Sequence, residues 1–150
     1  MTTCYDIANY FIWLANDTGS FISNLKLQKL VYYAQAWHLA IKDAPLFEED
    51  FEAWIHGPVI PALYQKYKQF GWKPILEEVQ FPHLPEETRQ FLDDVAAEYF
   101  SCDGYYLERM THVETPWIEA RKGLPIDSPG NEIITKDSMK RYFATRVQKA

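Results

Sequence analysis

The sequence predicts a mainly α-helical single domain, with about six helices and a short strand or hairpin after the second helix. Three observations support this fold class. Apolar residues recur at helical spacing along most of the chain, Gly and Pro separate these runs, and only short segments, at 51–55 and 75–81, have the pattern of a strand. The 150 residues suffice for one hydrophobic core, so we expect a single domain over 1–150.

The first two helices have clear start and stop signals. Thr3, supported by Asp6, is the expected N-cap of the first helix, and NDTG (16–19) is expected to end it. Ser23 or Asn24 caps the second helix. For about four turns its apolar face keeps i, i+3, i+4, i+7 spacing, through Leu27, Leu30, Val31, Ala34, Trp37, His38 and Ile41. The opposite face is expected to carry Lys26, Lys29, Tyr33 and Lys42.

The segment FEAWIHGPV (51–59) raises the question of whether His56 is reactive or structural. FEAWI predicts a short strand that His56 ends, Gly57 permits a tight turn, and Pro58 suits the first position of a helix. That helix would have Val59, Leu63, Tyr67 and Phe70 on one face and Gly71 at its end. ILEEVQF (75–81) predicts a second strand that pairs with 51–55.

Helices also dominate the expected second half. One is predicted over 86–99, and Asp103 can cap a short helix that runs through His112. In ETPWIEARKG, Thr115 is the expected cap, with Pro116 at the first helical position. A loop is expected over 124–132. Thr135 caps the last helix, whose apolar face would contain Met139, Tyr142, Phe143 and Val147.

Charge and composition argue against several classes of protein. The net charge of −6, from 15 basic and 21 acidic residues, does not suit a general nucleic-acid binder. Lys26 and Lys29 could touch phosphates in a helix-turn-helix, but the linker before them is longer than the usual turn. A DNA-binding phage or prophage regulator therefore stays a third hypothesis. Two isolated cysteines, no signal peptide and no membrane segment predict a cytoplasmic protein.

No catalytic, cofactor-binding or metal-binding residues are expected. The four histidines lack metal-ligand spacing, and neither GxxxxGK[ST] nor GxGxxG occurs. A Cys–His site of Cys4 or Cys102 with His112 is a weaker interpretation than buried cysteines. An enzyme that uses His56 with Cys102 or Glu52 remains the second hypothesis.

Aromatic residues are abundant: 5 Trp, 10 Tyr and 9 Phe. Many crowd the first half, and one helix face cannot bury them all, so some rings should be exposed and should mark a binding surface for another protein. The predicted contact residues are Tyr33, Trp54, His56, Tyr64, Tyr67 and Lys68.

Several segments together resemble a known family. LKLQKLVYYAQAWHLA (25–40) and PLFEEDFEAWIHGPVIPALYQKYKQFG (45–71) are similar to the Panacea domain of proteins related to the phage-associated protein GepA and the antitoxin SocA. THVETPWIEARKG (111–123) and MKRYF (139–143) fit the end of that domain.

This resemblance implies a helical antitoxin with no enzymatic step, which neutralises the toxin of a neighbouring gene by direct binding. An alternative that it implies is a proteolytic adaptor that delivers a toxin to a ClpXP-type protease. It also implies that His56-Gly57-Pro58 belongs to the scaffold, as a strand-to-helix junction.

Overall fold

The computed structural model describes residues 2–147 and confirms a mainly helical fold with a small sheet. Seven α-helices and one 3₁₀-helix lie within these residues, and the sheet has three short strands. The elements are α1 (Cys4–Thr18), α2 (Asn24–Lys42), β1 (Phe51–Trp54), β2 (Gly57–Val59), α3 (Pro61–Tyr67), η1 (Lys68–Phe70), α4 (Glu86–Tyr99), α5 (Gly104–His112), α6 (Thr115–Ala120), β3 (Ile133–Ile134) and α7 (Lys136–Ala144).

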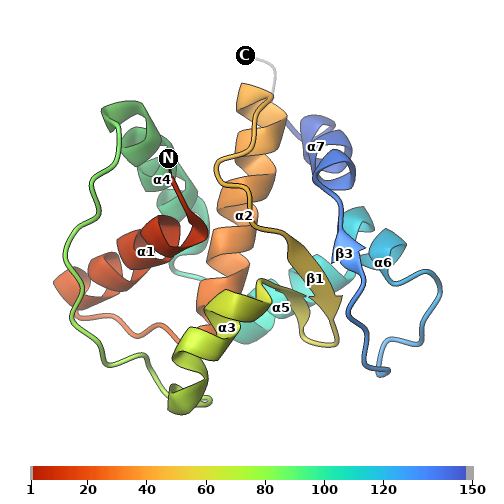
Figure 1. Ribbon diagram of the computed structural model, residues 1–150, viewed down its shortest axis with the longest axis horizontal. Coiled ribbons are helices and arrows are strands. Elements are labelled where there is room, and N and C mark those ends of the chain that lie inside the picture. The colour runs from red at the N-terminus through yellow and green to blue at the C-terminus, as the bar shows by residue number, and fades with distance from the viewer. Residues whose placement is uncertain (1, 148–150) are drawn as a thin grey trace.

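Helix α2 stands at the centre of the molecule. In Figure 1, α1 and α4 lie on one side of it, and α7 and the sheet lie on the other. It also contacts α3 and α5. Because neighbours surround α2, the expected exposed face is wrong for three residues: Lys26, Lys29 and Tyr33 are buried.

The predicted caps of four helices are confirmed. Thr3 and Asp6 form a capping box at α1, and the side chains of the other three caps accept a hydrogen bond from a backbone N–H; these caps are Ser23, Asp103 and Thr135. Helix α6 differs from the prediction, because Thr115 is its first helical residue and Glu114 is the N-cap.

The hairpin after α2 is confirmed. A third strand, from another part of the chain, joins it to form the sheet. β1 pairs antiparallel with β2 on one edge and with β3 on the other. The predicted pairing of 75–81 with 51–55 is therefore wrong, since both edges of β1 are occupied. The segment instead crosses α1, where the Phe81 ring lies 4.8 Å from that of Trp13.

His56-Gly57-Pro58 covers the end of the hairpin turn and the start of β2, and it is not a strand-to-helix junction. Ile55 and His56 form the turn, and Gly57 and Pro58 already belong to β2. Gly57 has φ +102°, which glycine adopts without strain and which the start of a helix does not use. Helix α3 begins later, with Pro61 at its first turn.

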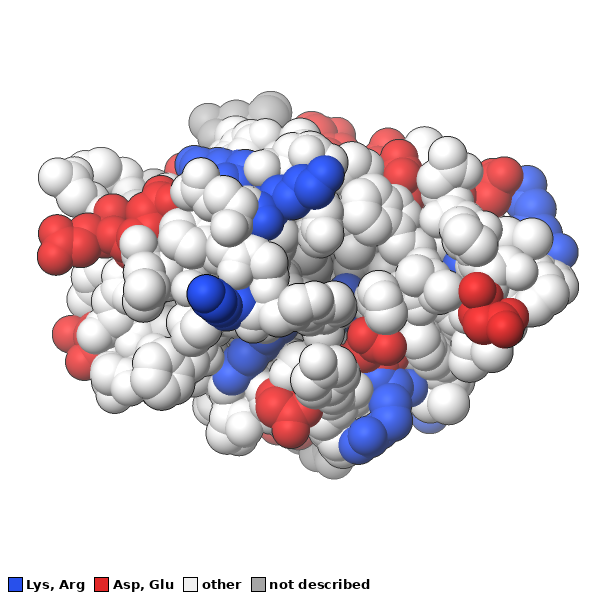
Figure 2. All heavy atoms as spheres, turned by 90° about the horizontal axis from the view of Figure 1, so that it is seen from below, with Lys and Arg blue, Asp and Glu red and all other residues white. Residues whose placement is uncertain are grey.

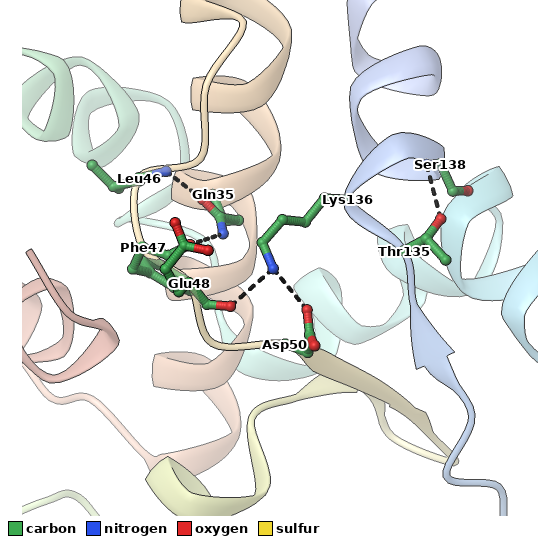
Figure 3. Close-up of polar contacts among 8 residues, drawn as sticks. All are labelled: Gln35, Leu46, Phe47, Glu48, Asp50, Thr135, Lys136 and Ser138. Carbon is green, nitrogen blue, oxygen red and sulfur yellow. Dashed lines mark hydrogen bonds and ion pairs between the residues drawn. The ribbon is translucent and has the colours of Figure 1, made fainter.

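Two buried glutamines of α2 hold the segments on either side of the hairpin. Gln35 donates to the carbonyl of Phe47 (2.7 Å) and accepts from the backbone N–H of Leu46 (2.7 Å), as Figure 3 shows. Gln28 accepts from the backbone N–H of Ile60 (3.1 Å), just before α3. Because a buried amide needs partners, each glutamine fixes the path of its segment.

The segment between α2 and β1 is also bound to α7. The Lys136 ammonium binds the carbonyl of Glu48 (2.9 Å) and the carboxylate of Asp50 (2.7 Å), also visible in Figure 3. The strand β1 that follows is therefore held from α2 and from α7.

Candidate partner-binding surface

The hairpin turn rests on a buried lysine. The Lys29 ammonium donates to the carbonyl of Pro58 at 3.1 Å, and the residue is fully buried. Burial lowers the pKa of Lys29 to about 7, against the opposite influence of Glu108. A Cβ on Gly57 would lie 2.6 Å from Cε of Lys29 and 2.8 Å from Oγ1 of Thr111. This glycine therefore permits close packing of the turn on α2.

His56 lies on the outside of this turn. Its side chain is 54% exposed, and its Nδ1 is 3.2 Å from a carboxylate oxygen of Glu108. Glu52 instead accepts a hydrogen bond from the indole N–H of Trp54 (2.8 Å). Among the polar contacts of residues 2–147, none joins His56 to Cys102 or Glu52, so the groups of the enzyme hypothesis are not assembled.

Aromatic rings gather beside His56. The Trp72 ring lies 6.0 Å from the His56 ring and is 68% exposed, and Trp54 packs edge-on against Tyr64 at 5.1 Å. Lys68 is exposed and lies between Tyr64 and Trp72 in sequence. We call this surface the hairpin patch, and it consists of Trp54, His56, Tyr64, Lys68 and Trp72.

Two predicted contact residues are buried and contribute no exposed area to this surface. Tyr33 and Tyr67 have no exposed area, so the expectation that they present ring surface is wrong. Tyr33 stacks on Tyr99 at 4.3 Å between ring centres and donates to Glu114 at 2.9 Å. Trp72 was not among the predicted contact residues, and its signal is a tryptophan between Gly71 and Lys73, outside any helical pattern.

The segment TPWIEAR supports the hairpin patch from behind. The indole of Trp117 donates to the carbonyl of Trp54 (2.8 Å), and the buried guanidinium of Arg121 donates to the carbonyl of Ala53 (3.1 Å). The same guanidinium binds the carbonyls of Pro125 and Ser128 and lies over the Trp117 ring. These contacts hold β1 and the loop after α6 in fixed positions.

Charge is unevenly distributed over the chain. Residues 61–75, which include part of the hairpin patch, contain Lys66, Lys68 and Lys73 and no acidic residue. Figure 2 looks at the end of the molecule where α3 lies, and its basic atoms are separated by uncharged and acidic ones. On this face there is no continuous basic stripe of the kind that follows a nucleic-acid backbone.

Comparisons with known proteins place the chain in a family. The family described as antitoxin SocA-like, Panacea domain, matches residues 27–118. The chain belongs to this family. Antitoxin SocA of Caulobacter vibrioides is 47% identical over 70 residues, which make up 47% of this chain and 37% of the relative. No solved structure matches.

The family match gives the hairpin patch its context. The Panacea match runs from near the start of α2 into α6 and includes every residue of the patch, together with Lys29 and Trp117 beneath it. Within residues 2–147, no helix is both long and apolar enough to cross a membrane.

Proposed function

We propose that this Panacea-domain protein is a cytoplasmic antitoxin, which neutralises the protein toxin of a neighbouring gene by binding it directly through the hairpin patch. The observation that carries the proposal is the family match, which covers all residues of the patch and, beneath it, Lys29 and Trp117. The relative bears the name antitoxin.

The patch has the composition of a binding surface. Trp, Tyr and His rings provide large contact areas that lose little conformational entropy, and such rings are enriched among the residues that dominate binding energy. The scaffold beneath them is rigid, since Lys29, Trp117 and Arg121 bind backbone carbonyls of the hairpin. A preorganised surface loses less free energy on binding than a flexible one.

The net charge of −6 favours encounter with a basic toxin. It does not favour the DNA-binding alternative, and neither does the burial of Lys26 and Lys29, which removes the two lysines that could have touched phosphates.

Co-expression in bacteria tests the proposal. The adjacent open reading frame is expressed alone and together with this chain, and growth is scored. Restored growth, with co-purification of the two proteins, is the expected result. Growth arrest that this chain does not relieve contradicts an antitoxin role.

The level of toxin then distinguishes direct masking from delivery to a protease. Masking leaves the amount of toxin unchanged and works in cells that lack ClpXP. An adaptor lowers the amount of toxin and loses its effect in those cells. We expect the first result.

A further inference from the structure

A second candidate surface lies at the other end of α2. A groove of about 760 Å³ runs between the C-terminal half of α2, helix α4 and the residues just after α7. Aromatic and aliphatic side chains line it, namely Trp37, Phe91, Val95, Tyr99, Ile41 and Val147. The indole N–H of Trp37 already donates to the Tyr99 hydroxyl at 2.8 Å, so these rings offer the groove mainly apolar surface.

Part of this apolar lining is exposed to solvent. Ile41 is 53% exposed and Val147 is 37% exposed. A volume of this size is typical of a binding pocket and holds several apolar side chains. The groove is therefore large enough for one face of a partner helix.

The rim of the groove carries charges of both signs, since Lys42 and Arg146 line it together with three carboxylates of α4. Asp94 and Glu98 are one helical turn apart and both line the groove. Neither has an ion-pair partner among residues 2–147, whereas Glu87 on the same helix pairs with Lys42 at 3.0 Å.

These two charges are unfavourable for α4 itself. Like charges at i, i+4 destabilise a helix, and negative charge near its C-terminus opposes the helix dipole. The last turn of α4 contains no basic residue to compensate. A cation placed between the two carboxylates by a partner would remove both costs.

We propose that this groove binds an amphipathic helix of a partner protein, whose apolar stripe fills the groove and whose Lys or Arg residues pair with Asp94 and Glu98. Such a helix matches the apolar lining and the two carboxylates, while Lys42 is already paired with Glu87 and Arg146 lies over the Tyr142 ring. A second copy of this chain matches it less well, because both copies carry a net charge of −6.

The inference goes beyond the proposed function, because the groove is separate from the hairpin patch. The patch rests on Lys29, and the groove uses Trp37 to Lys42, roughly 12 to 20 Å further along the α2 axis. Two surfaces on one rigid helix could be occupied at the same time.

A designed peptide tests the groove without any toxin. The probe is a labelled helical peptide of about 18 residues, with Leu at positions i, i+3, i+4 and i+7 and Lys elsewhere. A matched peptide has Glu in place of Lys. Fluorescence anisotropy with the full chain should show at least tenfold tighter binding of the Leu/Lys peptide, and the difference should shrink with salt. Equal binding of the two peptides, or no binding of either, overturns the proposal.

Charge reversal locates the binding site. We expect the double variant Asp94→Lys, Glu98→Lys to bind the Leu/Lys peptide with about tenfold lower affinity, the effect expected from the loss of two ion pairs. The control combines Asp17→Lys with Glu78→Lys, which changes the net charge equally at exposed positions outside the groove. If both double variants weaken binding equally, the attraction is non-specific and the groove is not the site.

An apolar substitution completes the test. Ile41→Ser should lower the affinity for the Leu/Lys peptide several-fold, because apolar contact area is lost. The protein should stay folded, because Ile41 is more than half exposed. Unchanged affinity overturns the proposal. So does a concentration-dependent dimer that Ile41→Ser abolishes, since the groove would then bind a second copy. Because the assay contains no toxin, its failure is distinct from a failure of growth rescue.

Discussion

The ammonium of Lys29 lies 3.1 Å from the carbonyl oxygen of Pro58, fully buried beneath the turn that presents His56. This contact joins the central helix to the hairpin, and no carboxylate among residues 2–147 forms an ion pair with the lysine. The position of the hairpin patch therefore depends on the protonation and the packing of Lys29 in the core.

Gly57→Ala tests the close packing of the turn. Alanine is strained at φ +102°, and its methyl group would meet Lys29 and Thr111 in a buried space that cannot expand freely. We expect the free energy of unfolding to fall by about 2–4 kcal/mol in urea denaturation. Gly19→Ala is the control, since Gly19 also has positive φ (+65°) but has open space around it. An equal loss in both variants would show that backbone strain alone is responsible.

Lys29 should make stability depend on pH above neutrality. The pKa of Lys29 is lowered to about 7 in the folded protein, so between pH 7 and 10 the unfolded chain binds more protons at this residue. Its contribution to the free energy of unfolding therefore rises with pH, by up to about 3 kcal/mol from pH 7 to 9.5. The measurement is the difference between the wild type and Lys29→Met across this range. Lys73→Met, at an exposed lysine, should follow the wild type, and parallel curves for Lys29→Met would contradict the prediction.

The contribution of Glu114 to the free energy of unfolding should fall as pH rises, opposite to that of Lys29. Burial raises the pKa of Glu114 to about 7, so the folded protein keeps a proton there that the unfolded chain loses near pH 4.5. The stabilisation is present below pH 4.5 and is lost as pH rises through 7. Glu114→Gln keeps an acceptor for Tyr33 and should be more stable than the wild type by about 1–3 kcal/mol at pH 8. Glu78→Gln, at an exposed carboxylate, is the control, and an unchanged pH profile in Glu114→Gln would refute this assignment.

Trp72→Ala tests the hairpin patch. Because Trp72 is 68% exposed, its removal should leave the thermal midpoint almost unchanged. It should nevertheless lower affinity for the toxin by about 2 kcal/mol, the size expected for an aromatic residue central to an interface. Isothermal titration calorimetry gives the affinity, and Ile126→Ala, at an exposed apolar residue in another loop, is the control. Full affinity in Trp72→Ala would place the toxin elsewhere.

Local patterns predicted the helices well, because caps and periodicity are local properties. Thr3, Ser23 and Asp103 cap their helices through bonds to the next few residues. The same patterns misjudged Lys29, since its hydrogen-bond partner lies 29 residues away along the chain. A lysine on a helix is expected to be exposed unless a distant carbonyl is known to meet it.

Long-range pairing also explains the error at 75–81. The alternation there is real, since Val79 and Phe81 are partly buried and Glu78 and Gln80 are exposed. The segment nevertheless finds no place in the sheet, because Ile133-Ile134 occupies the second edge of β1. Two residues are too short to give a strand pattern.

Some of the predicted contact residues are exposed, and others are buried because neighbouring elements surround α2. Trp54, His56, Tyr64 and Lys68 come from the hairpin, α3 and η1, and all four retain exposed or partly exposed surface. Tyr33 was expected on the face of α2 opposite its apolar residues, and the neighbouring Tyr32 points about 100° away from it. Neighbouring helices cover both sides, and both rings are buried.

The sheet that carries the hairpin patch takes its third strand from residues 133–134, and α7 covers a side of α2. A ribosome therefore releases the residues that complete this scaffold only after it has released the hairpin and helices α3 to α6. Until then the second edge of β1 has no partner and the side of α2 that faces α7 is open to water. A chain that is still being translated therefore presents the hairpin patch on an incomplete scaffold until β3 and α7 have left the ribosome.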